Sequence, residues 1–278
     1  MHLFTSKITL QQYLGDLLNE TTIGFVPTMG SLHSGHLKLI LSSKQACDIT
    51  ICSIFVNPTQ FNNPQDLKSY PKDLDSDLGK LKKINCDVVY APPVEDLYRP
   101  EEKAKKFNFG SLTKKMEGRF RPGHFNGMAT VIEKFFTIIN PTTAFFGEKD
   151  LQQLQIVKAL VTQMNSTIII TGVPTVREKN GLAKSSRNNL LSNNGKVTAS
   201  IIYKHLLYCK KNQKQGIKKL KLYILNEFKK QKELTLEYIE FVELDTLLPI
   251  DKWKAKNKNA ICIAAYHSGI RLIDNIIL

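Results

Sequence analysis

Long apolar runs are absent from this sequence of 278 residues. The first residues, MHLFTSKITLQQYL, contain no hydrophobic stretch of signal-peptide length, and no segment approaches the roughly 18 to 20 apolar residues that a membrane-spanning helix requires. Low-complexity segments and internal repeats are also absent. With 42% hydrophobic residues the chain can nevertheless bury a sizeable core. We therefore expect a cytoplasmic globular protein with no membrane partner.

Cysteine is scarce, and no two cysteines form a CxxC pair. Five are present, an odd number, and three lie in or beside apolar runs where a reduced thiol packs as a small hydrophobic group. We expect free thiols and no zinc site built from them. The five are Cys47, Cys52, Cys86, Cys209 and Cys262.

Acidic residues are outnumbered by basic ones, 25 to 39, which gives a formal net charge of +14. Much of the excess lies between Lys204 and Lys232, where ten lysines accompany a single acid, Glu227. Arginine is missing from this stretch, and aromatic residues do not alternate with the lysines as a nucleic-acid stacking platform requires. The pattern favours a solvated helical face with no nucleic-acid partner. An RNA-binding role is the alternative, and it predicts binding that weakens steeply with salt.

Five short runs rich in β-branched and aromatic residues mark the first two-thirds of the chain. Each is nearly all apolar, as in strands covered on both faces, and amphipathic helical patterns fill the intervals. This alternation predicts right-handed βαβ crossovers and an α/β fold, an open parallel sheet with helices on both faces. The predicted strands are 22–28, 49–56, 87–92, 143–148 and 167–175.

The pattern changes after Val173-Pro174. A polar loop precedes two lysine-rich amphipathic helices, at about 195–212 and 217–231, and a strand at 236–244 and one final apolar strand from 260 onward follow them. We therefore divide the chain into a first domain, residues 1–175, and a smaller C-terminal α/β domain, residues 176–278.

The stretch HSGH, His33 to His36, follows the first predicted strand and begins a helix. Its two imidazoles are three residues apart, so both project from the first helical turn, where the macrodipole of about half a positive charge favours neutral imidazole and attracts phosphate. Gly30 and Gly35 let the backbone approach a ligand closely. The pattern indicates a polyphosphate site that stabilises a leaving pyrophosphate. A zinc site, which lacks a local third ligand, and helix-terminal histidines without chemistry are the alternatives.

Two further segments combine cations with polar groups. In GEKD, Gly147 to Asp150, Lys149 can hold a phosphate as a point charge, whereas Asp150 either caps the next helix or reaches a ribose hydroxyl or a hydrated Mg²⁺ ion. KSSR, Lys184 to Arg187, offers two hydroxyls and two cations that could fold over a triphosphate. An ordinary surface loop is the alternative for KSSR.

Amide side chains follow the second predicted strand. Asn57 and Gln60 lie in a turn made rigid by a proline, where they can bind a carboxylate or a hydroxyl without adding charge, and Gln153 is a candidate partner. Holding loops together is the alternative, because buried amides must find partners. Arg121 and His124 in RPGHF face either this cleft or a neighbouring subunit.

Together these segments resemble the pantothenate synthetase family, the pantoate:β-alanine ligases. Six motifs match in order over roughly residues 20 to 192. They are PTMGSLHSGH, SIFVNPTQF, YPKDLDSDL, GRFRPGHFNGM, FFGEKDLQQL and GVPTVREKNGLAKSSRN. The resemblance implies a Rossmann-like domain at residues 1–175, a C-terminal lid and a homodimer. It also implies that pantoate and MgATP give pantoyl adenylate and pyrophosphate, and that β-alanine then yields pantothenate and AMP.

The resemblance also implies roles for individual residues. The catalytic residues would be His33, His36, Lys149 and Arg187, with His36 as the proton donor, and Asp150 would meet Mg²⁺ through ATP. Pantoate and β-alanine would be bound by Met29, Asn57, Gln60 and Gln153. ATP would be bound by Met29, Gly30, Ser31, Leu32, His33, Ser34, Gly35 and His36, by Gly147, Glu148, Lys149 and Asp150, and by Val176, Lys184, Ser185, Ser186 and Arg187.

Two positions depart from the family pattern. Lys184 stands where Leu or Met usually precedes Ser-Ser-Arg, so its ammonium group either binds phosphate or points to solvent, and Lys72 stands where Arg is commoner. Nucleotide-coenzyme adenylyltransferases and small class I aminoacyl-tRNA synthetases are rival assignments for HxGH with KSSR. The former leave NPTQF and RPGHF unexplained, and the latter need an anticodon-binding domain, for which we find no segment.

Overall fold

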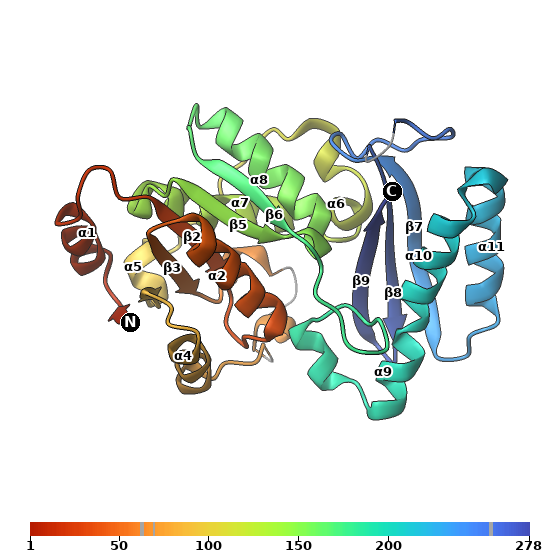
Figure 1. Cartoon of the computed structure of the whole chain (residues 1–278), viewed down its shortest axis with the longest axis horizontal. Coiled ribbons are helices and arrows are strands. Elements are labelled where there is room, and N and C mark those ends of the chain that lie inside the picture. Colours follow the sequence, from red (N-terminus) through yellow and green to blue (C-terminus); the bar gives the residue numbers. More distant parts are fainter. Residues whose placement is uncertain (62–63, 69, 256–257) are drawn as a thin grey trace. The chain divides into compact units, whose positions relative to one another are not determined.

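The computed structural model describes residues 1–61, 64–68, 70–255 and 258–278. The chain forms two compact units (Figure 1). The first consists of Met1–Glu148 and Gln153–Pro174, and the second of Lys149–Gln152 and Thr175–Leu278. In the described ranges, no helix has the length and apolar character that crossing a bilayer demands. All five cysteines are free thiols, as predicted.

The first unit is built on a six-stranded sheet in which all pairings are parallel. The strands are β1 (His2–Phe4), β2 (Ile23–Thr28), β3 (Ile49–Ile54), β4 (Val88–Tyr90), β5 (Thr143–Gly147) and β6 (Ile169–Val173). Their spatial order is β1-β4-β3-β2-β5-β6. The five predicted strands are confirmed within their predicted ranges. β1 was missed, because three residues are too few to show a pattern.

Helices cover both faces of this sheet, as predicted (Figure 1). The longer ones are α1 (Lys7–Gly15), α2 (Ser34–Ala46), α4 (Leu74–Lys83), α7 (His124–Ile139) and α8 (Leu151–Gln163). On one face, Ile40 of α2 and Leu81 of α4 join Val26 of β2 in a buried cluster. On the other face, Phe135 of α7 lies against Phe25 with ring centroids 5.5 Å apart. Neighbouring residues of β2 thus serve opposite faces, as the pleat of a strand requires.

Shorter elements complete the first unit. They are α3 (Pro64–Lys68), α5 (Val94–Leu97), α6 (Met116–Phe120) and the 3₁₀ turns η1 (Pro58–Gln60) and η2 (Gly110–Thr113), while η3 (Glu148–Asp150) precedes α8.

The chain reverses its direction of travel across the sheet at β2. β3 and β4 lie on one side of β2, whereas β5 and β6 lie on the other. In open parallel sheets, ligands bind beyond the carboxyl ends of the strands at such a reversal, because the outgoing loops diverge and leave a crevice. The loop from β2 into α2, which carries His33, begins at this point.

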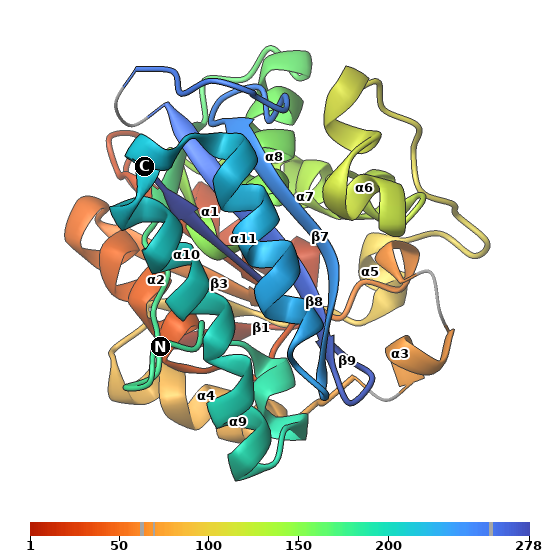
Figure 2. The same cartoon turned by 90° about the vertical axis from the view of Figure 1, so that its right-hand side faces the viewer.

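The second unit packs helices against a three-stranded antiparallel sheet of order β7-β8-β9. Its elements are η4 (Ser186–Leu190), α9 (Asn193–Ala199), α10 (Ile201–Lys211), η5 (Gln213–Gln215), α11 (Ile217–Lys229), β7 (Leu234–Glu243), β8 (Asn259–His267) and β9 (Ile270–Ile277). α10 contacts β9 and α11 contacts β7, so both lysine-rich helices cover one face of the sheet (Figure 2). Leu206, Leu220 and Ile224 bury their apolar side in the core.

Two predictions for this unit are wrong. The final apolar run is a hairpin of β8 and β9, not one strand, because Ser268 and Gly269 adopt positive φ angles of 48° and 79° and form a two-residue turn. The helix predicted at 195–212 is divided into α9 and α10 at Ser200, whose hydroxyl donates to the carbonyl of Val197 at 2.7 Å. A serine that bonds back to the preceding turn competes with continuation of the helix.

Candidate functional site

His33 and His36 close the first turn of α2. His33 is the N-cap residue, and its Nδ1 accepts a hydrogen bond from the backbone N–H of Gly35 at 3.1 Å. The Nδ1 of His36 accepts from the backbone N–H of His33 at 3.3 Å, so the two side chains form a reciprocal capping box. Their rings are stacked with centroids 4.1 Å apart. Helix capping therefore accounts for the three-residue spacing.

These capping bonds also fix the ring tautomers. A ring nitrogen that accepts a hydrogen bond carries no proton, so the proton of each neutral ring lies on Nε2. The two Nε2–H groups accompany the backbone N–H groups of a helix N-terminus, where the macrodipole favours an anion. Capping and a donor role are thus compatible, because capping uses Nδ1 whereas the proton of each neutral ring lies on Nε2.

A buried carboxylate shapes the loop between β2 and α2. Asp77 of α4 is 1% exposed, and its Oδ1 accepts from the backbone N–H of Leu32 at 2.8 Å and from the Lys80 ammonium at 3.2 Å. Gly30 and Ser31 both have positive φ, 80° and 51°. A Cβ at position 30 would also lie 3.1 Å from the Oδ2 of Asp77, a tight contact, so the positive φ and this close approach together favour glycine.

A cavity of about 290 Å³ lies beside this loop, at the carboxyl ends of β2, β3 and β4. Phe55, Val56 and Pro92 contribute apolar walls, whereas Lys72 and Asp77 contribute opposite charges. A small, mostly apolar hollow with few polar groups is typical of small-molecule sites. The cavity shares Met29 and Gly30 with the predicted ATP loop, whereas Asn57, Gln60 and Gln153 are not among its lining residues.

Asn57 uses both polar atoms of its buried side chain within the protein. Its Oδ1 accepts from the Tyr98 hydroxyl at 2.9 Å and from Thr59, and its Nδ2 donates to the carbonyl of Gly127 at 3.0 Å and to the Oε1 of Gln60 at 3.2 Å. Asn57 is also the N-cap of η1. These bonds favour the loop-holding alternative for Asn57.

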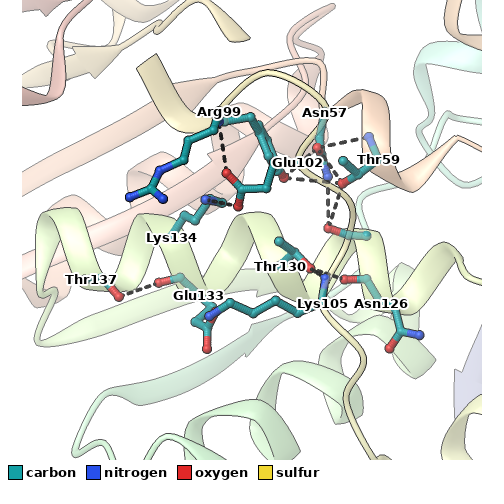
Figure 3. A network of polar contacts seen from close by, with 12 residues as sticks. Asn57, Thr59, Arg99, Glu102, Lys105, Asn126, Thr130, Glu133, Lys134 and Thr137 are labelled. Atoms are coloured by element: carbon teal, nitrogen blue, oxygen red, sulfur yellow. Dashed lines mark hydrogen bonds and ion pairs between the residues drawn. The ribbon is translucent and has the colours of Figure 1, made fainter. Parts of the chain in front are cut away.

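The loop around Asn57 is braced by a wider polar network (Figure 3). Glu102 accepts from the Lys134 ammonium at 2.7 Å and from the backbone N–H of Arg99 at 2.9 Å. The same Lys134 ammonium lies 4.8 Å from the ring centre of Tyr98, the residue that donates to Asn57. Helix α7 thus supports the Asn57 loop through charged as well as neutral contacts.

Gln60 is held at both its side chain and its backbone. Its side-chain amide contacts Asn57 and the sulfur of Met29, which is also a predicted substrate contact. Its carbonyl is 2.9 Å from the Nδ1 of His124, and the Nε2 of His124 is 3.0 Å from the Arg121 guanidinium. Because arginine only donates, His124 accepts at Nε2 and donates from Nδ1 to Gln60. RPGHF therefore contributes a support for the Gln60 turn.

The second unit carries the predicted ATP contacts at Lys149, Asp150, Val176 and Lys184 to Arg187. The Lys149 ammonium lies 3.5 Å from the Oδ1 of Asp150 in η3. Residues 176–184 form a hairpin in which the backbone N–H of Lys184 donates to the carbonyl of Val176 at 2.9 Å. Ser185 is the N-cap of η4 and accepts from the backbone N–H of Arg187 at 3.3 Å. KSSR is therefore a capped turn, with local order that a surface loop need not have.

Predicted site residues thus fall on both units. The first unit holds the segment from Met29 to His36, together with Asn57, Gln60, Gly147, Glu148 and Gln153, and the second holds Lys149, Asp150, Val176 and Lys184 to Arg187. Gln153 is half-buried in the first turn of α8, and burial raises the pKa of the Glu148 carboxyl. Convergence of these residues around one nucleotide stays a prediction.

Across the residues described, no group of three or more potential ligands could hold a metal ion, so a zinc site at HSGH lacks a ligand set there.

Comparison with known proteins decides the family. The family described as Pantoate-beta-alanine ligase matches residues 2–277, nearly the whole chain. The chain belongs to the pantoate-beta-alanine ligase family. The expectation drawn from six sequence motifs is therefore confirmed, and the match extends through the C-terminal region, where the motifs gave no guidance.

Similar proteins of this ligase family share both sequence and fold with the chain. A pantothenate synthetase of Flavobacterium psychrophilum is 44% identical over 281 residues, with 100% of both sequences covered. The crystal structure of pantothenate synthetase from Thermus thermophilus is 37% identical and superposes with a TM-score of 0.92, covering 100% of this chain and 99% of that one. The pantoate-beta-alanine ligase of Francisella tularensis, solved in complex with beta-gamma ATP and β-alanine, is 34% identical with a TM-score of 0.82, covering 100% and 97%.

Sequence reasoning gave no role to several residues that organise this ligase fold around its candidate site. Asp77 holds the loop at Leu32 and lies in the YPKDLDSDL motif. Sequence analysis could have found it, because it is an acidic residue on the buried face of an otherwise solvated helix. Arg177, Asp274 and Asn275 are bonded to one another in the second unit. Arg177 lies 97 positions from Asp274, so no local sequence pattern indicated this cluster.

Proposed function

We propose that this chain is an ATP-dependent ligase that condenses (R)-pantoate with β-alanine through a pantoyl-adenylate intermediate, releasing AMP and pyrophosphate. The observation that carries this proposal is the match of the ligase family to nearly the entire chain, together with the paired imidazoles at the helix N-terminus after β2. The related Francisella tularensis ligase, solved with beta-gamma ATP and β-alanine, supports ATP and β-alanine as substrates.

The chemistry requires activation of a poor acyl donor. Attack of an amine on a free carboxylate would expel oxide, whereas attack on an acyl adenylate expels AMP, a much better leaving group. The carboxylate oxygen of pantoate attacks the α-phosphorus of ATP and pyrophosphate leaves; the β-alanine amine then attacks the acyl carbon and AMP leaves. Alignment and charge stabilisation do most of this work, so no covalent nucleophile is needed.

The candidate residues divide these tasks. His33 and His36 would donate from Nε2 to the phosphates as charge builds on pyrophosphate, with His36 as the proton donor, and Lys149 and Arg187 would supply positive charge. ATP would lie along Met29 to His36, Gly147 to Asp150, Val176 and Lys184 to Arg187. Pantoate and β-alanine would lie near Met29, Gln60 and Gln153, with Asn57 fixing the Gln60 turn.

Magnesium would enter with the nucleotide. Asp150 is about half exposed and its carboxylate is a hard oxygen donor, which fits a Mg²⁺ ion that keeps most of its ligands from water and ATP phosphates. The ion would neutralise charge on the phosphates.

We further assign residues 1–175 to nucleotide and pantoate binding and residues 176–278 to a lid. We also expect a cytoplasmic homodimer without a nucleic-acid partner.

One assay tests this function. The purified protein is incubated with ATP, Mg²⁺ and pantoate, with and without β-alanine, and pyrophosphate and AMP are quantified. We expect pyrophosphate to depend on pantoate and free AMP to be released at speed only with β-alanine. A coenzyme adenylyltransferase would retain AMP in its product, and a protein that binds RNA without catalysis would release neither product.

A further inference from the structure

Strand β9 contacts both segments of the second unit that carry predicted ATP contacts. The side-chain Nδ2 of Asn275 donates to the carbonyl of Lys149 at 2.8 Å, although the two residues are 126 positions apart. Arg187 donates to the carbonyl of Arg271 at 3.4 Å. Because β9 is the last strand in the order β7-β8-β9, its outer edge is open to such contacts.

Asn275 is itself held through its backbone. Its backbone N–H donates to the Oδ1 of Asp274 at 2.8 Å, and its carbonyl accepts from the guanidinium of Arg177 at 3.2 Å. Arg177 also makes a two-pronged ion pair with Asp274, at 2.6 and 3.0 Å. Asp274 and Asn275 are each only 5% exposed. Planar, charge-assisted pairs of this kind restrict geometry more than single bonds do.

Arg177 joins this cluster to the 176–184 hairpin. Its guanidinium donates to the carbonyl of Gly181 at 3.2 Å and lies 3.5 Å from the ring centre of Tyr203 in α10. The guanidinium is therefore held by β9, by the hairpin and by an aromatic ring. The Arg177–Asp274 pair therefore contacts the hairpin directly and the Lys149 segment through Asn275.

Charge reinforces the arrangement. Burial raises the pKa of the Asp274 carboxyl, and the positive charges of Arg177 and, more weakly, Lys149 act in the opposite direction. The ammonium of Lys149 therefore lies within electrostatic reach of Asp274, and the backbone carbonyl of Lys149 accepts a hydrogen bond from Asn275. Two adjacent residues of β9 thus interact with Lys149: Asn275 binds its carbonyl, and its positive charge slightly offsets the raised pKa of Asp274.

We propose that Asn275 is a positioning residue for Lys149, and that the Arg177–Asp274 pair fixes Asn275 in place. The proposal rests on the function proposed above, in which Lys149 holds an ATP phosphate. A displaced ammonium would still attract ATP but would meet the reacting phosphates at the wrong point, and displacements of about 1 Å can cost on the order of a hundredfold in rate. The expected defect is in the rate of adenylation.

The experiment compares Asn275→Asp and Asn275→Ala with matched variants of Asn259 in the full-length chain. Asn259 is also buried, and its Nδ2 donates to the carbonyls of Lys254 and Ala255 at 3.2 and 3.1 Å, at the start of β8. Asn259→Asp and Asn259→Ala therefore remove an equivalent backbone contact in the same unit without touching Lys149. Asn275→Ala removes the donor without adding a buried charge, so the proposal can still be tested if Asn275→Asp does not fold.

We expect kcat for pantoate-dependent pyrophosphate release to fall about tenfold in the Asn275 variants, with KM for pantoate unchanged and with less than about a twofold change in the Asn259 variants. In a Lys149→Ala background, Asn275→Ala should cost nothing further, because the two changes act on one group. Equal kcat in the Asn275 and Asn259 variants, or full additivity with Lys149→Ala, would overturn the positioning role. A fully active Lys149→Ala protein would instead overturn the function assigned to Lys149.

Discussion

Lys184 and Glu178 face each other across the 176–184 hairpin and form an ion pair of 2.7 Å. The backbone of each residue is also bonded within the hairpin, Glu178 N–H to Leu182 and Lys184 N–H to Val176. The pair answers the question raised by the departure from the family pattern at position 184. The ammonium is directed to a carboxylate of its own hairpin, so a contact of residue 184 with ATP would use its aliphatic stem or backbone, as the usual Leu or Met would.

Lys184→Met should therefore leave ATP use nearly unchanged. We expect KM for ATP to stay within about threefold, and stability to fall by less than about 1 kcal/mol, because a partly exposed ion pair contributes little. Initial-rate kinetics at two salt concentrations and thermal unfolding check this. A rise of KM by an order of magnitude that shrinks with added salt would place the ammonium on phosphate instead. Glu178→Gln is the matched control, since it leaves the ammonium without its carboxylate.

His36 offers a way to separate capping from catalysis. His36→Ala removes both the imidazole and the acceptor for the His33 N–H, whereas His36→Gln restores an acceptor at a position where glutamine completes capping boxes. We expect both variants to release pyrophosphate two to three decades more slowly, about 2 to 4 kcal/mol of transition-state stabilisation, as for loss of an oxyanion-type donor.

Only His36→Ala should also lose stability, by about 0.5 to 2 kcal/mol, the usual cost of a lost cap. Pyrophosphate release and urea unfolding, measured on both proteins, make the comparison. Normal release by His36→Gln would mean that the ring serves the helix alone.

The sheet of the first unit was predictable because its strands are buried on both faces, so β2 and β3 read as continuous apolar runs. The motifs were predictable for a related reason, since parallel strands place successive loops at one edge. The hairpin of β8 and β9 was not, because Ser268-Gly269 is a short interruption in a run that is apolar on both sides. The supports of the site were hidden for a different reason: the bonds of Asp77 to Leu32 and of His124 to Gln60 join residues 45 and 64 positions apart.

Gly127 lets α7 approach the Gln60 turn. A Cβ at this position would lie 2.1 Å from the carbonyl oxygen of Thr59 and 2.7 Å from the Cα of Gln60, both backbone atoms. Gly127→Ala must therefore move η1, at a cost of about 1 to 3 kcal/mol for overpacking, and should raise KM for pantoate more than KM for ATP. Gly79→Ala, in helix α4 with nothing within 4 Å of the added carbon, is the control and should stabilise the protein slightly. Steady-state kinetics and thermal unfolding of both variants check this, and a Gly127→Ala protein that matches Gly79→Ala in both would contradict the close approach.

His205 makes the stability of the second unit sensitive to pH. It is 4% exposed, with Nδ1 3.1 Å from the hydroxyl of Tyr223 and its ring beside Phe228, and burial lowers its pKa below the usual 6.5. Lys204 and Lys230 add to the lowering, while Glu227 opposes it. As pH falls through 6.5, the unfolded chain takes up a proton that the folded chain refuses, so folding stability must decrease, at most about 1.4 kcal/mol per pH unit.

Urea unfolding of the wild type and of His205→Phe between pH 7.5 and 5 isolates this effect. Asp48, Glu102 and Glu227 have lowered pKa values, so the stability they contribute is present above the carboxyl range and is lost only at more acidic pH. Glu148 and Asp274, whose pKa values are raised, contribute equally in both proteins. The wild type should therefore lose stability relative to His205→Phe, which keeps a ring but cannot take up a proton. Parallel profiles would mean that His205 has the same pKa in the folded and the unfolded chain. Burial of His205 could then not cause any loss of stability in acid.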